Sequence, residues 1–161
     1  MDWGFVLDFL IEIGYFLLVF GILLGYSIFK GRQGIMNLIM GLYIALLVSI
    51  EFPYYDFILK GIESQQGMAA MQLAFFGIST ILSTILFFRI MPDEFRENRF
   101  ESLSKKFLLT VSATILIMIF SFQVLPITEF LTPGTPIQSL FAPEGFFFWW
   151  LLLPLIVIYI V

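Results

Sequence analysis

The chain has 161 residues, of which 60% are hydrophobic and only 12% charged, and its mean hydropathy is +1.01. A soluble domain carries about twice that charged fraction, so an ordinary water-soluble protein is excluded. Histidine and cysteine are both absent, which removes the usual general base, the thiol nucleophile and the commonest metal ligands. The net charge of −4 gives no indication of nucleic-acid binding.

The first two predicted elements are apolar runs at residues 5–29 and 35–52. Each is close to the ~20 residues that a helix needs to cross the hydrocarbon core of a bilayer. Between them stands Lys30-Gly31-Arg32-Gln33-Gly34, where the two glycines allow an abrupt reversal of the backbone. The sequence therefore predicts an antiparallel hairpin of two membrane helices.

Three further apolar runs follow at residues 71–90, 107–125 and 145–161. The last is short and holds Pro154 in its middle, so it is interpreted either as a fifth span or as a re-entrant or interface-lying segment. Segment 92–106 alternates acidic and basic residues, which predicts a short helix on the inner leaflet, and the proline-rich segment 126–144 is expected to be irregular. The predicted fold is an all-α polytopic bundle of four to five transmembrane helices, in one domain over residues 1–161.

The basic residues predict the direction of threading. Of the eight, all but Lys60 fall on one side of the predicted spans. Since positive loops stay in the cytoplasm, that side is predicted to be cytoplasmic and the N-terminus to lie outside, in the inner membrane. The residues assigned to the inner-leaflet interface are Arg89, Arg96, Arg99, Lys105 and Lys106, and those assigned to the hairpin turn and topology anchor are Lys30, Gly31, Arg32 and Gly34.

Small residues recur at helical spacing in the first two spans. In membranes such stripes let helix backbones approach closely, as in the GxxxG motif. We interpret them either as internal helix packing, in which the second-span stripe packs against Gly21 and Gly25 of the first span, or as the seam of a homo-oligomer. The residues are Gly14, Gly21 and Gly25 in the first span and Gly41, Ala45 and Ser49 in the second.

Acidic residues in the spans form the second set of candidates. Asp8 and Glu12 are four residues apart on one face of the first span, and Glu51 ends the second. A charge at mid-bilayer costs about 2.5–3.5 kcal/mol on insertion scales, so such acids mark a proton or cation site unless they are shallow and hydrated. Both interpretations stay open. The hydroxyl residues of the fourth span, Thr110 to Ser121, either line a path or bond to backbone carbonyls one turn back.

Several features resemble one known family. Asp8 early in the first span is followed by Gly25, the basic glycine turn and Gly41. This order is similar to the start of the colicin V production protein family, small bacterial inner-membrane proteins that typically have four spans. The matched positions are Asp8, Gly25, Gly31, Arg32, Gly34 and Gly41.

The likeness is looser beyond the second span. Where the family has Asp-Arg and glycines before the fourth span, this chain has Asn98 and Arg99 without the glycines, and the fifth apolar run is an addition. The resemblance implies an accessory membrane protein in peptide-toxin export and envelope maintenance, with no established enzymatic reaction.

We found no catalytic motif, so the sequence predicts no enzyme, no catalytic residues, no cofactor and no metal site. The leading hypothesis is an accessory or scaffold protein that packs in the bilayer with itself or with another membrane protein. The alternative is a small transporter or channel subunit that uses Asp8, Glu12 and Glu51 for proton or cation handling. A membrane enzyme is a distant third.

Overall fold

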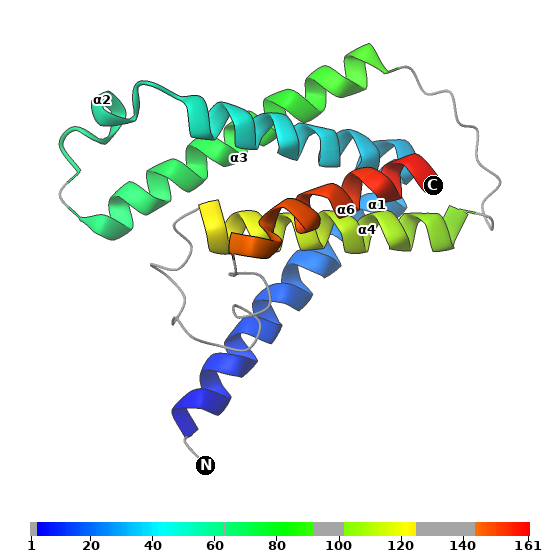
Figure 1. Ribbon diagram of the computed structural model, residues 1–161, viewed down its shortest axis with the longest axis horizontal. Coiled ribbons are helices and arrows are strands. Elements are labelled where there is room, and N and C mark those ends of the chain that lie inside the picture. Colours follow the sequence, from blue (N-terminus) through cyan, green and yellow to red (C-terminus); the bar gives the residue numbers. More distant parts are fainter. Residues whose placement is uncertain (1–2, 63, 92–101, 125–143) are drawn as a thin grey trace.

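The computed structural model describes residues 3–62, 64–91, 102–124 and 144–161, and these residues form helices and short connections (Figure 1). In chain order the elements are α1 (Trp3–Glu51), α2 (Tyr55–Leu59), α3 (Gln65–Ile90), α4 (Ser102–Ile119), the π-helix η1 (Phe120–Val124), the 3-10 turn η3 (Glu144–Phe146) and α6 (Phe147–Ile160).

The first two predicted spans belong to one helix that is broken at a single residue. Gly31 has φ 75° and ψ −175°, and it is the only residue of α1 with non-helical dihedral angles. The expected turn at Lys30–Gly34 is therefore wrong in extent, because one glycine is enough to redirect the chain. We call residues 3–30 the first arm of α1 and residues 32–51 the second arm.

The second arm lies at the centre of the fold (Figure 1). It packs against α3 and α4, and α6 packs in turn against α4. The first arm crosses α4, where Phe20 contacts Phe107 with ring centroids 5.8 Å apart, and its N-terminal part projects beyond the other helices (Figure 1). Half of the most apolar stretch of α4 is buried in the fold, against 17% for α1 and for α3, so α4 is the most enclosed of the long helices.

Among the described residues, three helices are long and apolar enough to cross a membrane. The qualifying stretches are Phe9–Glu51, Gln65–Ile90 and Leu103–Phe122, with mean hydropathies of 2.1, 1.9 and 1.7. The fourth apolar helix, Phe147–Ile160, is shorter at 14 residues and contains Pro154. The prediction of an all-α, multi-pass membrane protein is thus supported at this level by helix length and composition.

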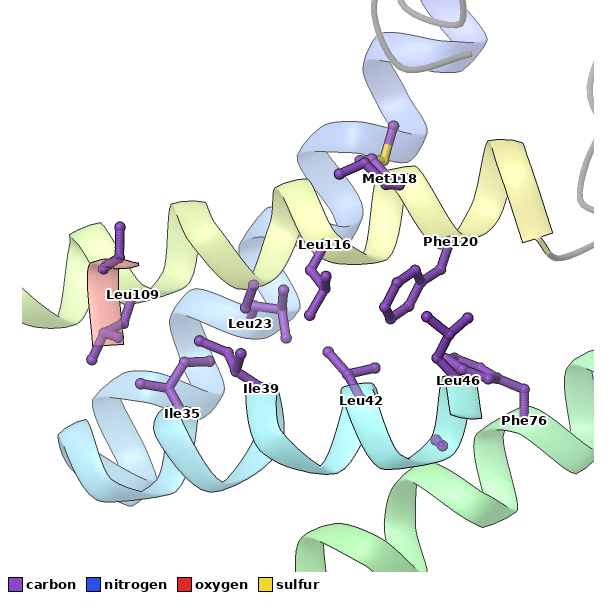
Figure 2. Close-up of a cluster of buried hydrophobic side chains, with 14 of the residues drawn as sticks. Leu23, Ile35, Ile39, Leu42, Leu46, Phe76, Leu109, Leu116, Met118 and Phe120 are labelled. Carbon is purple, nitrogen blue, oxygen red and sulfur yellow. The ribbon is translucent and has the colours of Figure 1, made fainter. Parts of the chain in front are cut away.

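Side chains of α1 and α4 form the core (Figure 2). Leu116 of α4 and Phe120 of η1 point toward the second arm, where Leu42 and Leu46 meet them. Phe120 also contacts Phe76 of α3 edge-to-face, with ring centroids 6.0 Å apart. Because Phe120 is fully buried and stands where α4 changes to a π-helix, the core is organised around this junction.

The helix boundaries differ from the apolar runs in instructive ways. Helix α3 begins at Gln65 rather than 71, because Ser64 caps it by accepting a hydrogen bond from the backbone N–H of Gly67 at 3.1 Å. Helix α4 begins at Ser102, so residues 102–106 of the expected interfacial segment extend the span. The rest of that segment, 92–101, and most of the proline-rich segment, 125–143, lie outside the described residues.

Candidate functional site

The break between the two arms is built from glycine geometry. A residue with a side chain is essentially never found at the dihedral angles of Gly31. At Gly34 a Cβ atom would stand 2.5 Å from the Cβ of Lys30 and 3.7 Å from the ring of Phe88. The two glycines therefore have separate roles, since Gly31 turns the chain and Gly34 leaves room for the turn against α3.

The second-arm stripe faces α3. A Cβ atom on Gly41 would meet Thr84 of α3, at 3.0 Å from its backbone nitrogen and 3.2 Å from its Cα. Ala45 and Ser49 follow on the same stripe and are buried. The absence of a side chain at Gly41 lets the backbones of α1 and α3 approach closely, which is how membrane helices without large interlocking residues pack.

The first-arm stripe does not meet the second arm. Apart from the adjoining residues and the nearby backbone of α1 itself, no atom of the described part of the chain lies within 4 Å of a Cβ built on Gly14, Gly21 or Gly25. The expected pairing of the second-span stripe with Gly21 and Gly25 is therefore wrong, because Gly41 takes Thr84 of α3 as its neighbour instead. The small-residue face of the first arm is left open.

The acidic candidates are in different surroundings. Glu12 is 2% exposed, and neither carboxylate oxygen has a hydrogen-bond partner in the described part of the chain. Glu51 is exposed at the far end of α1, and the two ends of this helix lie well apart (Figure 1). The structure thus does not bring Glu51 to Glu12. The Asp8 side chain lies outside what the structure describes.

Glu12 stands beside a polar link between α1 and the π-helix η1. One turn further on, Tyr15 lies 2.8 Å from the Ser121 hydroxyl. Ser121 donates its own proton to the Ile117 carbonyl at 2.7 Å, so Tyr15 is the donor in the first bond. The buried carboxylate is therefore within one helical turn of an ordered hydroxyl pair.

The hydroxyl groups of α4 form hydrogen bonds within their own helix. Thr110, Ser112 and Thr114 each donate to the carbonyl four residues earlier, at 2.7, 3.0 and 2.8 Å. These bonds consume the hydroxyl protons within the helix. The interpretation in which these groups bond one turn back is thus confirmed for the residues described.

One link between helices was not foreseen. The hydroxyl of Tyr43 on the second arm donates to the backbone carbonyl of Leu151 on α6. Pro154, three residues later, supplies no N–H and crowds the carbonyls of the preceding turn. The helix hydrogen bond that Pro154 cannot form is the one to the carbonyl of Trp150, so the Tyr43 bond attaches the second arm to the same turn of α6. Pro154 was the available sequence signal, but nothing in the sequence indicated which helix would supply the donor.

The basic residues gather toward one end of the bundle. Gln33 of the second arm contacts Met91, just past the end of α3, with 3.8 Å between Nε2 and Sδ. Figure 2 shows Leu109, near the start of α4, at the Ile35 end of the second arm and Phe120 at its Leu46 end. The break in α1, the end of α3 and the start of α4 therefore share one end. The described basic residues there are Lys30, Arg32, Arg89, Lys105 and Lys106, while Arg96 and Arg99 lie outside the described residues.

Aromatic side chains mark the opposite end of the α1–α3 pair. Phe52 packs against Phe75 of α3 with ring centroids 4.3 Å apart, and Tyr55 of α2 joins them at 5.1 and 5.5 Å. Aromatic rings settle at membrane–water interfaces. The pair of helices thus has a basic end and an aromatic end.

Comparisons with known proteins gave no match, whether against family models, curated proteins or solved structures.

Proposed function

We propose that the protein is a polytopic inner-membrane accessory or scaffold protein, which acts by packing the first arm of α1 against a second copy of itself or another membrane protein. The observation that carries this proposal is the open stripe of Gly14, Gly21 and Gly25. The corresponding stripe of the second arm is already occupied by α3, so of the two arms it is the first that presents its small residues to a further helix.

The surroundings of the stripe support a helix partner. The first arm projects from the rest of the fold (Figure 1), and its side chains Leu17, Leu18 and Ile22 are each more than half exposed. Lipid chains are as apolar as leucine, so such side chains alone favour no partner. Three glycines in register add close backbone contact, which a second helix offers and a lipid does not.

The cellular role rests on the resemblance. Asp8, Gly25, the Gly31–Gly34 turn and Gly41 are the positions similar to the colicin V production family. We propose on this basis a role in peptide-toxin export or envelope maintenance, without an enzymatic reaction. Loss of the protein is then expected to reduce export of a peptide toxin or to sensitise the envelope to detergent, and neither effect in a deletion strain would contradict this role.

The proposed threading places the N-terminus outside. The two arms of α1, then α3 and α4, form four spans, and α6 is the fifth. The shared basic end of the bundle supports a cytoplasmic location for the break in α1. The aromatic end near Phe52 and Tyr55 is then the outer interface.

Matched glycine substitutions test the packing proposal. Gly77 of α3 is as open to a Cβ atom as Gly21, so Gly21→Leu and Gly77→Leu add the same side chain to two free faces. In a mild detergent, light scattering should find wild type and Gly77→Leu as oligomers or partner complexes and Gly21→Leu largely as monomer. A wild-type protein that is monomeric in detergent and forms no cross-link to a partner in cells would contradict the proposal.

A second candidate function is favoured by Glu12. A buried carboxylate without hydrogen-bond partners in the described residues is unfavourable unless a proton or cation joins it. We propose as the alternative that Glu12 handles protons or cations in a small transporter or channel subunit, with Asp8 one turn earlier.

Reconstituted vesicles test this alternative. A pH- or cation-driven flux should be lost in Glu12→Gln and kept in Glu51→Gln, whose carboxylate is exposed at the other end of α1. No flux in wild type, or equal flux in wild type and Glu12→Gln, would rule it out.

A further inference from the structure

A pocket of about 410 Å³ lies between the two arms of α1 and helix α3. This volume is within the range of about 300–1,000 Å³ typical of small-molecule sites. Ile22, Tyr26 and Lys30 line it from one face of the first arm, at intervals of four residues. Thr80, Thr84 and Phe88 line it at the same spacing from α3, so the pocket is a groove along two helix turns, about 12 Å long.

The walls of the groove present mainly hydrocarbon, because the hydroxyl groups of its threonines are bonded within α3. The hydroxyl of Thr80 donates to the Phe76 carbonyl at 2.9 Å, and that of Thr84 donates to the Thr80 carbonyl at 2.7 Å. Both protons are thus committed within α3. Leu23, Leu38 and Ile85 supply further hydrocarbon surface. A hydrocarbon chain fits such walls, whereas a polar solute would lose its bonds to water without replacement.

One end of the groove carries positive charge. Lys30 lines the groove at the break in α1, is exposed, and makes no hydrogen bond or ion pair with the described residues. Arg89 follows the lining residue Phe88 at the same end of the bundle. The groove therefore combines a hydrocarbon slot with a cationic mouth.

We propose that this groove holds one acyl chain of an anionic phospholipid, whose phosphate lies at Lys30. Basic pockets between membrane helices on the cytoplasmic side recognise anionic headgroups in this way. The shape selects a hydrocarbon chain, and the charge selects an anionic over a zwitterionic headgroup. The lipid would brace the two arms against α3 and thereby set the angle at which the first arm projects. The site does not depend on the identity of the first arm's partner.

A pair of tryptophan substitutions tests the slot. Ile81 lines the groove and is 61% exposed, and its neighbour Leu82 is 63% exposed but does not line it. Ile81→Trp should fill the groove, whereas Leu82→Trp adds the same bulk outside. In native mass spectrometry of delipidated protein, mixed with equal amounts of phosphatidylglycerol and phosphatidylethanolamine of identical chains, we expect Ile81→Trp to retain at least fivefold less phosphatidylglycerol than Leu82→Trp.

Substitutions at Lys30 test the headgroup. Lys30→Gln should reduce the preference for phosphatidylglycerol severalfold, Lys30→Arg should keep it, and Lys60→Gln, at a distant exposed lysine, should leave it unchanged. The proposal is overturned if the wild type shows no preference, if both tryptophan variants lose lipid equally, or if Lys30→Gln keeps the full preference.

Discussion

The hydroxyl of Tyr43 on the second arm of α1 donates a hydrogen bond to the backbone carbonyl of Leu151 on α6, one turn before Pro154. The same ring packs edge-to-face on Phe120, with centroids 6.4 Å apart. Tyr43 therefore joins the last apolar helix to the core at the turn that Pro154 weakens.

Tyr43→Phe should lower the free energy of unfolding by about 1 kcal/mol, because it removes the hydrogen bond and keeps the ring. The control is Tyr26→Phe, since the Tyr26 hydroxyl has no hydrogen bond within the described residues. Unfolding by a denaturing detergent, followed by the fluorescence of Trp149 and Trp150 on α6, measures the difference. Equal stability of the two variants would show that α6 does not depend on this bond.

Gly31→Ala should destabilise the angle between the arms by about 1–3 kcal/mol, because its dihedral angles are essentially restricted to glycine. Asparagine, which tolerates ordinary left-handed backbone, should not rescue the site. Gly25→Ala is the control, since Gly25 is helical and open.

Spin labels can measure this effect, because the chain has no native cysteine. Labels at Leu18→Cys and Leu47→Cys, both 59% exposed, report the distance between the arms. The distance distribution should widen or shift in Gly31→Ala and stay narrow in Gly25→Ala. An unchanged distribution in Gly31→Ala would contradict the assigned role of this residue.

Gly41→Ala should lower the free energy of unfolding by about 1–3 kcal/mol, because the new methyl group overlaps the backbone of Thr84. Gly21→Ala should be neutral or slightly stabilising in the monomer, since alanine favours a helix over glycine by about 1 kcal/mol and the space is open. Thermal unfolding in detergent at low protein concentration separates the two. Equal losses would mean that both stripes pack internally.

Single cysteines test the threading. Phe29 and Phe57 are 90% and 78% exposed, at the basic and aromatic ends of the bundle respectively. A membrane-impermeant maleimide should label Phe57→Cys in cells with an intact inner membrane, and Phe29→Cys only after that membrane is permeabilised. The reverse pattern would show that the N-terminus is inside.

The sequence was sufficient for some parts of the fold and not for others. Apolar run length identified the helices, and the glycines between Lys30 and Gly34 identified the break in α1. Helix periodicity does not say which face meets which neighbour, so Gly41 was paired with the wrong helix. Contacts between residues far apart in the chain, such as Tyr43 with Leu151, depend on the tertiary arrangement and leave no local pattern.

The candidate site was also predicted only in part from the sequence. Spacing drew attention to Glu12, but its burial and its lack of partners in the described residues depend on how α1 packs. The grouping with Glu51 failed because the two arms of α1 diverge from the break at Gly31 instead of folding back along each other (Figure 1). The groove at Lys30 required three segments to converge, and no single stretch of the sequence indicates it.

Cysteine cross-linking through the first arm tests the central claim most directly. Leu18 follows Gly14 by one turn, and Leu18→Cys and Leu82→Cys are comparably exposed, at 59% and 63%, on the first arm and on α3. In native membranes under mild oxidation, Leu18→Cys should form a disulfide-linked dimer or a defined adduct, Leu82→Cys should not, and Gly21→Leu should abolish the product. If Leu18→Cys stays monomeric, or if Leu82→Cys links equally well, the first arm is not the packing surface.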